Sequence, residues 1–345
     1  MSVLIPSYGR PDKLRNLLAS LLEQQTDGLR FEVLVGLDGG EEREAQSLVT
    51  SLPTARRGDF KISAFPRSGH ASVRNGLLES ARGRLVLSLN DDVVATPRLI
   101  AEHAGAHEQA RAEGRRVMVV GAADWRIHPD DTVFDRLVRE TSMIFFYDVM
   151  DDPARGDTSR IDWGFRHAWG LNTSMHTEDM RRVGAYKVFS AWYGAEDIEL
   201  AYRVAALPGG RAVWYRRAAH VEHDHRVCPR EYVEREYKLG YNAFHFAREC
   251  AEASSATYGR DVASQEEIVY SGEFVRREAS AARRARAHIE RAGSAPAREA
   301  AGWSVLREAL YLAHLPLKRW CWRIGLTDAA GGAPLDPAKA LAQSA

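Results

Sequence analysis

The sequence predicts an α/β fold with a mainly parallel sheet flanked by helices, followed by a helical C-terminal region. Two observations carry this prediction. Short apolar runs alternate with helical periods over the first 120 residues, which is typical of parallel strands joined by right-handed crossovers. After residue 229 the periodicity becomes helical to near the end of the chain.

The elements of the first part follow in order. Strands are expected at 3–5, 31–37, 61–65, 84–89 and 117–120, with helices from Pro11, at 41–52, at 72–81 and after Pro97. The pattern loosens from 121 to 225, where one helix (197–206) and one strand (212–215) stand out. A further amphipathic helix is expected over 232–248. We expect one domain over 1–228, a helical region over 229–328, and a disordered Ala/Gly/Pro-rich segment over 329–345.

Composition excludes several classes. The 345 residues carry 47 Lys and Arg against 47 Asp and Glu, so a generally basic nucleic-acid binder is not expected. Three cysteines without a CxxC pair argue against a disulfide scaffold or a structural zinc site. No apolar run is long enough for a membrane span, and the first residues resemble a strand rather than a signal peptide. We therefore expect a cytoplasmic protein, and an enzyme by its size.

Acidic residues follow two of the expected strands. Asn90-Asp91-Asp92 ends the fourth strand, where carboxylates at the ligand edge of the sheet suit Mg²⁺ or Mn²⁺. The same triplet could instead cap the following helix. Asp38, in Leu37-Asp38-Gly39-Gly40, could accept hydrogen bonds from a base or a ribose, although Asp-Gly is also an ordinary turn signal.

Two further clusters could carry chemistry. Glu196 and Asp197 open a helix, where free N–H groups favour carboxylates, and Asp197 could accept a proton from an attacking hydroxyl. Capping alone would also explain one acid. His220, His223 and His225 follow a strand and could complete a metal site, or form only a surface cluster.

Six short motifs in order resemble the family 2 glycosyltransferases of the GT-A fold. The resemblance covers residues 2–245. The motifs that carry it are Ile5-Pro6-Ser7-Tyr8-x-Arg10, Leu37-Asp38-Gly39, Ala71-Ser72-x-Arg74-Asn75-Gly76, Leu89-Asn90-Asp91-Asp92, Gly170-Leu171-Asn172-x-Ser174 and Glu196-Asp197-x-Glu199-Leu200-x-x-Arg203.

The resemblance implies an inverting transfer of a sugar from a nucleoside-diphosphate donor, with UDP favoured, to a carbohydrate, lipid-linked or small-molecule acceptor. Residues 1–120 would form the nucleotide-binding half and 121–228 the acceptor half. Asp197 would be the catalytic base, and Asp92 with His223, or alternatively His225 and then His220, would bind Mn²⁺ or Mg²⁺. The resemblance assigns the nucleotide to Pro6, Ser7, Arg10, Asp38, Arg74 and Asp91, and the sugar and acceptor to Asn172, Trp192 and Glu196.

One departure from the family pattern is Asn90, where an Asp is usual, and it puts in doubt how tightly metal binds without nucleotide. A catalytically inactive sugar-binding or interaction protein is the main alternative. A nucleotidyltransferase would need a phosphate loop after the first strand, and a Rossmann dehydrogenase would need GxGxxG there, and neither is present.

The C-terminal helices leave two interpretations open. An Arg-rich stretch (276–291) and a Trp/Leu/Arg segment (303–326) could lie on an anionic membrane surface. We favour packing of the second segment against the catalytic domain or a second subunit, because Glu308 interrupts its basic side. The expected partners are therefore the donor and acceptor, with peripheral membrane contact and a homodimer as further options.

Overall fold

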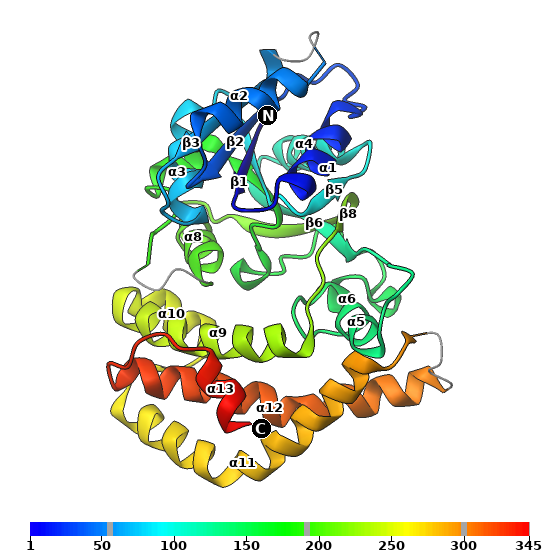
Figure 1. The fold of residues 1–345 in the computed structure, drawn as a ribbon. Helices are drawn as coiled ribbons and strands as arrows, with labels where there is room; N and C mark the ends of the chain where they lie inside the picture. Colours follow the sequence, from blue (N-terminus) through cyan, green and yellow to red (C-terminus); the bar gives the residue numbers. More distant parts are fainter. Residues whose placement is uncertain (54–57, 190–193, 298–301, 345) are drawn as a thin grey trace. The chain divides into compact units, whose positions relative to one another are not determined.

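The computed structural model describes residues 1–53, 58–189, 194–297 and 302–344. The chain forms two compact units (Figure 1). The first comprises Met1–Arg126, Met150–Val188 and Glu196–His225, and the second comprises Ile127–Val149, Phe189–Ala195 and Arg226–Ala345. The segments 127–149 and 189–195, which the sequence assigns to the 1–228 domain, thus belong to the unit that contains the C-terminal helices.

An eight-stranded sheet in the order β3-β2-β1-β4-β7-β6-β8-β5 is the centre of the first unit. Its strands β1 to β4 are mutually parallel, β6 pairs in parallel with β8, and the pairs of β4 with β7, β6 with β7, and β5 with β8 are antiparallel. The strands are β1 (Ser2–Ser7), β2 (Glu32–Asp38), β3 (Phe60–Phe65), β4 (Leu85–Leu89), β5 (Val93–Ala95), β6 (Val117–Trp125), β7 (Asn172–His176) and β8 (Ala212–His223). This mainly parallel α/β architecture confirms the predicted fold class.

Helices cover the sheet where the sequence places apolar stripes. Helix α1 (Pro11–Leu22) begins with a proline and buries four leucines, α3 (His70–Ser80) packs on β1 and β2, and α4 (Leu99–Ala112) packs on β6 and β8. The remaining helices of this unit are α2 (Glu42–Ser51), α7 (Thr177–Arg182), α8 (Glu196–Ala205) and the 3₁₀ turns η2 (Pro153–Arg155) and η3 (Phe165–His167).

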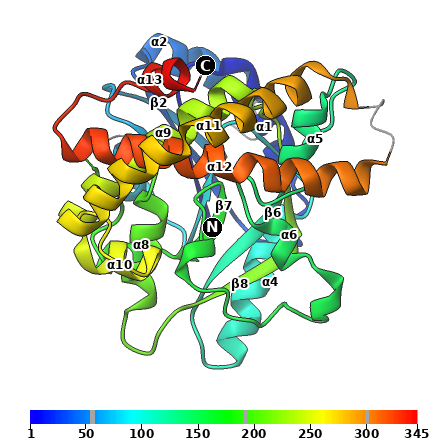
Figure 2. The same cartoon turned by 90° about the horizontal axis from the view of Figure 1, so that it is seen from below.

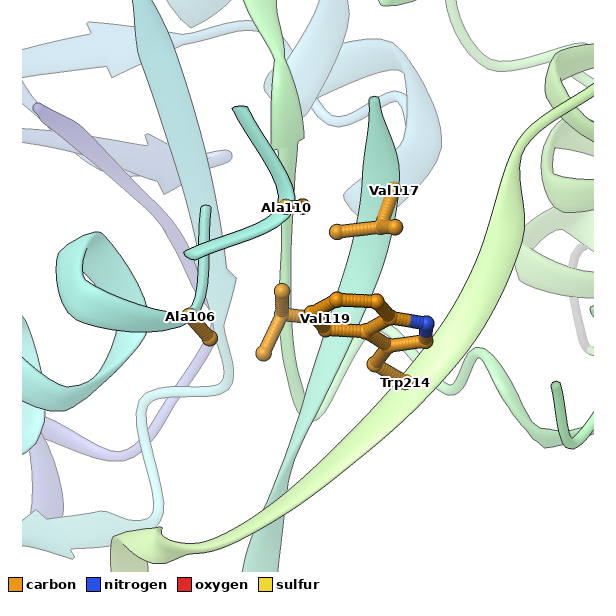
Figure 3. Close-up of a cluster of buried hydrophobic side chains, with 5 residues drawn as sticks. All are labelled: Ala106, Ala110, Val117, Val119 and Trp214. Carbon is orange, nitrogen blue, oxygen red and sulfur yellow. The ribbon is translucent and has the colours of Figure 1, made fainter. Parts of the chain in front are cut away.

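The close packing of α4 against the sheet is illustrated by one apolar cluster (Figure 3). Ala106 and Ala110 of α4 lie against Val117 and Val119 of β6 and the Trp214 ring of β8. The small alanine side chains leave room for the indole, and each of the five residues is at most 2% exposed. This cluster fixes the α4 side of the sheet.

The second unit is helical. It contains α5 (Val133–Arg139), α9 (Pro229–Glu249), α10 (Ala251–Tyr258), α11 (Gln265–Ser294), α12 (Trp303–Ala330) and α13 (Ala338–Gln343), and Figure 2 shows the long helices of this unit. The short helix α6 (Tyr147–Met150) spans the point at which the chain passes between the units. Helix α12 packs on both α9 and α11, and a Cβ at Gly240 of α9 would come within 1.7 Å of the Trp322 carbonyl oxygen. The backbones of α9 and α12 therefore touch.

Several elements differ from the sequence prediction, among them two strands of the sheet and the last helix. Strands β5 and β7 were not expected, because β5 has three residues and β7 has mostly polar ones. The segment expected to be disordered instead contains α13, where Lys339 pairs with Asp328 and Arg286 donates a hydrogen bond to Ser344.

In the described part of the chain, no helix has the length and apolar character needed to cross a bilayer.

Candidate active site

The candidate site lies at the carboxyl ends of the parallel strands, as expected for such sheets. Ser7 ends β1, Asp38 ends β2, and Asp91 and Asp92 follow β4. The Ser7 hydroxyl donates to Asp91 Oδ2 at 2.7 Å, across 84 residues of sequence. The parallel pairing of β1 with β4 brings these two residues together.

Arg10 contacts both acids of the Asn-Asp-Asp motif. Its guanidinium lies 2.5 Å from Asp91 Oδ1 and also donates to Asp92 Oδ2. Burial raises the pKa of Asp91, which Arg10 opposes. Burial would also raise the pKa of Asp92, but His223, Arg10 and His225 hold it well below its usual value. Asp92 is thus an ionised carboxylate that is only 4% exposed.

Two histidines approach the same carboxylate. His223 Nε2 lies 3.5 Å from Asp92 Oδ1, and His225 Nδ1 lies 3.6 Å from Asp92 Oδ2. The two imidazoles are stacked, with centroids 5.6 Å apart, and His223 also lies against Trp125. His220 points elsewhere and contacts Asp124 at 3.0 Å. The structure therefore brings the first two histidine candidates to Asp92 and separates the third from it.

The donor atoms around Asp92 bear on whether a divalent cation can bind there. Within the described ranges, no group of three His, Cys, Asp or Glu side chains is arranged ready to hold a metal ion. The donor set nevertheless fits one, because a buried carboxylate and two imidazoles are ligands that Mn²⁺ accepts. Asp92 Oδ1 is buried and makes no hydrogen bond to any residue that the structure describes. Asp92, His223 and His225 are consequently the residues that could hold such an ion.

Asp38 is held by three donors from the loop before α3. Arg67 donates to Oδ2, as does the Gly69 amide at 3.1 Å, and the Ser68 amide donates to Oδ1 at 2.7 Å. The Arg67 guanidinium lies 3.5 Å from the centroid of the exposed Tyr8 ring. Asp38 is therefore a buried acid whose partner arginine reaches the surface beside an aromatic ring.

Arg74 joins the two acidic motifs of the site. This side chain is 1% exposed, and its guanidinium donates to Asn90 Oδ1 at 2.8 Å and to the Gly170 carbonyl at 3.0 Å. The same group lies 3.5 Å from Asp197 Oδ1. One buried cation thus connects the motif after β4 with the start of α8, and Asn90 accepts one of its hydrogen bonds.

The two acids at the start of α8 have different environments. Glu196 Oε1 lies 2.5 Å from His70 Nε2, whereas Asp197 faces Arg74. Burial opposes ionisation of Glu196, but His70 holds its pKa below the usual value. Burial and the neighbouring Glu196 charge raise the pKa of Asp197. Such a separation of two adjacent carboxyl groups is typical of an acid–base site.

The Oδ1 atom of Asp197 is buried and faces the Arg74 guanidinium. Among the described residues, its Oδ1 atom makes no hydrogen bond, although the side chain as a whole is 24% exposed. The residue two positions before it, Ala195, has φ of 81°, a conformation that costs about 1–2 kcal/mol for a residue with a Cβ. The Asp197 carboxylate therefore lies two residues beyond a position with a strained backbone.

Two predicted residues are placed differently from the others, and a third is not described. Asn172 is fully buried, and its amide donates to the carbonyls of Ala122 and Ala219 while its Oδ1 contacts His103 at 2.8 Å. The structure therefore gives Asn172 a place inside the sheet rather than on a pocket wall. Pro6 is a buried residue of β1. Trp192 lies outside the described residues.

Sequence reasoning did not identify His70 or Arg67 as site residues. Both lie within ten residues of Arg74, in the stretch Arg67-Ser68-Gly69-His70 that leads into α3. The available signal was a basic residue just before a helix and a histidine at its first position, on the ligand side of the sheet. Arg67 pairs with Asp38, 29 residues away, and His70 pairs with Glu196, 126 residues away. Only the fold shows these pairings.

Comparison with known proteins gives a consistent result. Residues 2–167 match the sequence model of Glycosyl transferase family 2. A validoxylamine A glucosyltransferase of Streptomyces hygroscopicus subsp. limoneus is 29% identical over 218 residues, which is 60% of this chain and 48% of that protein. An uncharacterised glycosyltransferase of Bacillus subtilis (strain 168), YfnE, is 37% identical over 111 residues, 31% of this chain and 26% of that one. The chain thus spans about half or less of the length of these relatives.

Solved structures share the fold. The mannosyltransferase PcManGT from Pyrobaculum calidifontis, in complex with GDP-Man and Mn²⁺, superposes with a TM-score of 0.54 at 17% identity, covering 95% of this chain and 86% of that one. At this level of identity the likeness concerns the fold alone. It agrees with the GT-A architecture expected from the sequence motifs.

Proposed function

Through residues 2–167 the chain belongs to glycosyl transferase family 2, and on that premise we propose that it transfers a sugar, with inversion, from a nucleoside-diphosphate donor to an acceptor hydroxyl. Asp197 is the general base of this proposal, and Asp92 with His223 and His225 holds a divalent cation. The nucleotide lies along Ser7, Arg10, Asp38 and Asp91, and UDP is the favoured nucleotide. A relative named as a glucosyltransferase supports a hexose donor.

The observation that carries the proposal is the position of Arg74. Its guanidinium donates to Asn90 Oδ1 at 2.8 Å and lies 3.5 Å from Asp197 Oδ1. Asn90 directly precedes Asp91 and Asp92, the acids on the diphosphate side. One buried guanidinium therefore contacts both this motif and the candidate base. An inverting transferase needs its leaving group and its base on opposite sides of the reacting carbon.

The reaction then follows from the chain's own groups. The acceptor oxygen attacks the anomeric carbon, the bond from that carbon to the diphosphate oxygen breaks, and the electron pair leaves with the diphosphate. Asp197 takes the proton of the acceptor hydroxyl as its oxygen bonds to carbon. Arg10, which is 41% exposed at the site surface, can donate to the departing diphosphate. A bound divalent cation would supply Lewis-acid neutralisation of that diphosphate.

Asp38 and its partners bear on recognition of the nucleobase. The carboxylate accepts from Arg67, Ser68 and Gly69, and the Arg67 and Tyr8 pair offers a flat surface beside it. A nucleobase can stack on such a surface while its N–H groups meet a carboxylate. This arrangement supports nucleotide binding at the end of β2 and leaves the choice between uracil, thymine and guanine to experiment.

The experiment that tests the proposal is calorimetric titration of UDP, dTDP and GDP, each with and without Mn²⁺. Wild type, Asp92→Asn and the exposed-site control Asp157→Ala would be compared after circular dichroism has shown that each is folded. We expect one nucleotide to bind in a Mn²⁺-dependent way, with the dependence lost in Asp92→Asn and kept in Asp157→Ala. Absence of binding by every nucleotide would instead favour the non-catalytic sugar-binding or interaction protein, and binding without metal would remove the cation from the proposal.

A further inference from the structure

Helix α3 presents two basic residues one turn apart to the first two residues of α8. His70 and Arg74 are at positions i and i+4 of α3 and therefore lie on the same face. His70 Nε2 is 2.5 Å from Glu196 Oε1, and the Arg74 guanidinium is 3.5 Å from Asp197 Oδ1. Each acid of the Glu-Asp pair thus has its own cation, supplied by a single helix.

The two pairs are not equivalent. The Arg74 guanidinium is always charged, and it is 1% exposed and bound also to Asn90 and the Gly170 carbonyl. The His70 side chain is 37% exposed and carries charge only when protonated. The positive charge beside Asp197 is therefore fixed, while the one beside Glu196 depends on the state of a single imidazole.

We propose that His70 is a positioning residue for transfer: its imidazolium neutralises and anchors Glu196, so that Asp197 rather than Glu196 receives the proton of the acceptor hydroxyl. This inference rests on the proposed function, because it assigns to His70 the control of the base in that reaction. His70 reaches Asp197 only through Glu196 and the electrostatic field, and it need not touch a substrate.

The physical argument is Coulombic. A negative Glu196 next to Asp197 disfavours a second negative charge, so the Glu196 charge raises the pKa of Asp197, and a positive His70 lowers it. The other groups that face this pair are Arg74 from α3 and the buried Tyr186 hydroxyl, which contacts Ser88. Among the described residues that contact the two acids, the cations are His70 and Arg74, and the Arg74 guanidinium is always charged.

The proposal predicts opposite shifts for two neighbouring substitutions. His70→Gln removes the cation, so the acidic limb of kcat/KM should move to higher pH by at least about half a unit. Glu196→Gln removes the anion, so the limb should move to lower pH by a similar amount. His70→Lys restores a permanent cation and should bring the limb back close to that of wild type. A purely structural role for His70 would lower kcat at every pH and leave the limb in place.

A second readout does not need turnover. Titration of ¹³C-labelled aspartate carboxyl groups by NMR, with the Asp197 signal identified by its loss in Asp197→Asn, measures the same shifts in the protein without substrate. His288→Gln on α11, a histidine that contacts Arg291 in the second unit, is the matched control and should move neither readout.

The outcomes separate the two proposals. Opposite shifts of the Asp197 signal in His70→Gln and Glu196→Gln support the role of His70, even if no transfer is detected. An Asp197 signal that stays in place in both variants overturns it, whether or not the enzyme is active. Activity with an acidic limb that Asp197→Asn leaves unchanged would overturn the proposed base instead.

Discussion

Gly170 and Asp197 are in direct contact: a Cβ atom built on Gly170 would lie 2.3 Å from Asp197 Oδ1 and 2.8 Å from its Cγ. The carbonyl of the same glycine accepts a hydrogen bond from Arg74. Gly170 therefore sets the distance between the candidate base and its cation. Only a residue without a side chain allows the carboxylate this position.

The first prediction concerns this contact. Gly170→Ala should displace the Asp197 carboxylate and reduce kcat by about 100-fold, the cost of a misplaced catalytic group. Nucleotide affinity by calorimetry should stay within a few-fold of wild type, because Gly170 is not among the residues proposed to bind the nucleotide. Gly105→Ala on α4, where an added Cβ meets nothing within 4 Å, is the control and should keep full activity. Equal activity of both variants would contradict the contact.

The second prediction concerns the base itself. Asp197→Asn keeps the size of the side chain but cannot accept a proton, so the transfer rate should fall by about 10²–10⁴-fold. Nucleotide binding should be nearly unchanged, since the nucleotide residues lie at the other acidic motif. Retention of more than about a tenth of the wild-type rate would remove Asp197 from the role of base.

The third prediction is the pH dependence of the reaction. Burial and Glu196 raise the pKa of Asp197, and a base acts only when it is deprotonated. The kcat/KM of the wild type should therefore fall on the acidic side of neutrality, about tenfold per pH unit below that raised pKa. Measurement of kcat/KM between about pH 4 and 8, a range that spans the ordinary pKa values of a carboxyl group and a histidine, checks this. A rate that stays level down to the ordinary carboxyl range would show that Asp197 is not shifted or not the base.

The fourth prediction concerns stability. Burial lowers the pKa of His103 to about 4, whereas the unfolded chain has the ordinary value of about 6.5. Below pH about 6.5 the unfolded state binds a proton that the folded state does not, so the free energy of unfolding falls as the pH drops from about 6.5 towards 4, by an amount on the order of 3 kcal/mol.

Urea unfolding at several pH values measures this loss. His103→Gln should be less stable at pH 7, because the buried contacts with Ser174 and Asn172 change. Its free energy of unfolding should also fall less steeply as the pH drops, because about one proton fewer is taken up on unfolding. His107, whose pKa burial also lowers, remains in that variant and keeps part of the dependence. The same pH slope in His103→Gln and wild type would show that His103 is not the group that resists protonation.

Much of the fold follows from local pattern, and the exceptions have physical reasons. The leucines of α1 and the apolar runs of β1, β2 and β4 identify elements without knowledge of their neighbours. Strand β7 reads Asn-Thr-Ser-Met-His, and its polar side chains are buried only because α4 supplies His103 and His107 as partners. Such a strand has no apolar signal to detect.

The candidate site shows the same division. The acids Asp38, Asp91, Asp92 and Asp197 fall at strand ends or at a helix start, so their positions are visible in sequence. Their partners are not: His70 meets Glu196 across 126 residues, and Arg67 meets Asp38 across 29. Asn172 shows the reverse case, since a polar residue in a motif is used to join strands rather than to face a ligand.

Arg10 also affects the loop after β4 in the absence of any ligand. Because this arginine already contacts both Asp91 and Asp92, the acid pair carries its own counterion. Two neighbouring buried carboxylates would otherwise repel each other and loosen the loop after β4. The loop after β4 therefore does not depend on a bound cation to balance its two carboxylates. Under the proposed function, a divalent cation would meet a loop whose negative charge Arg10 already balances.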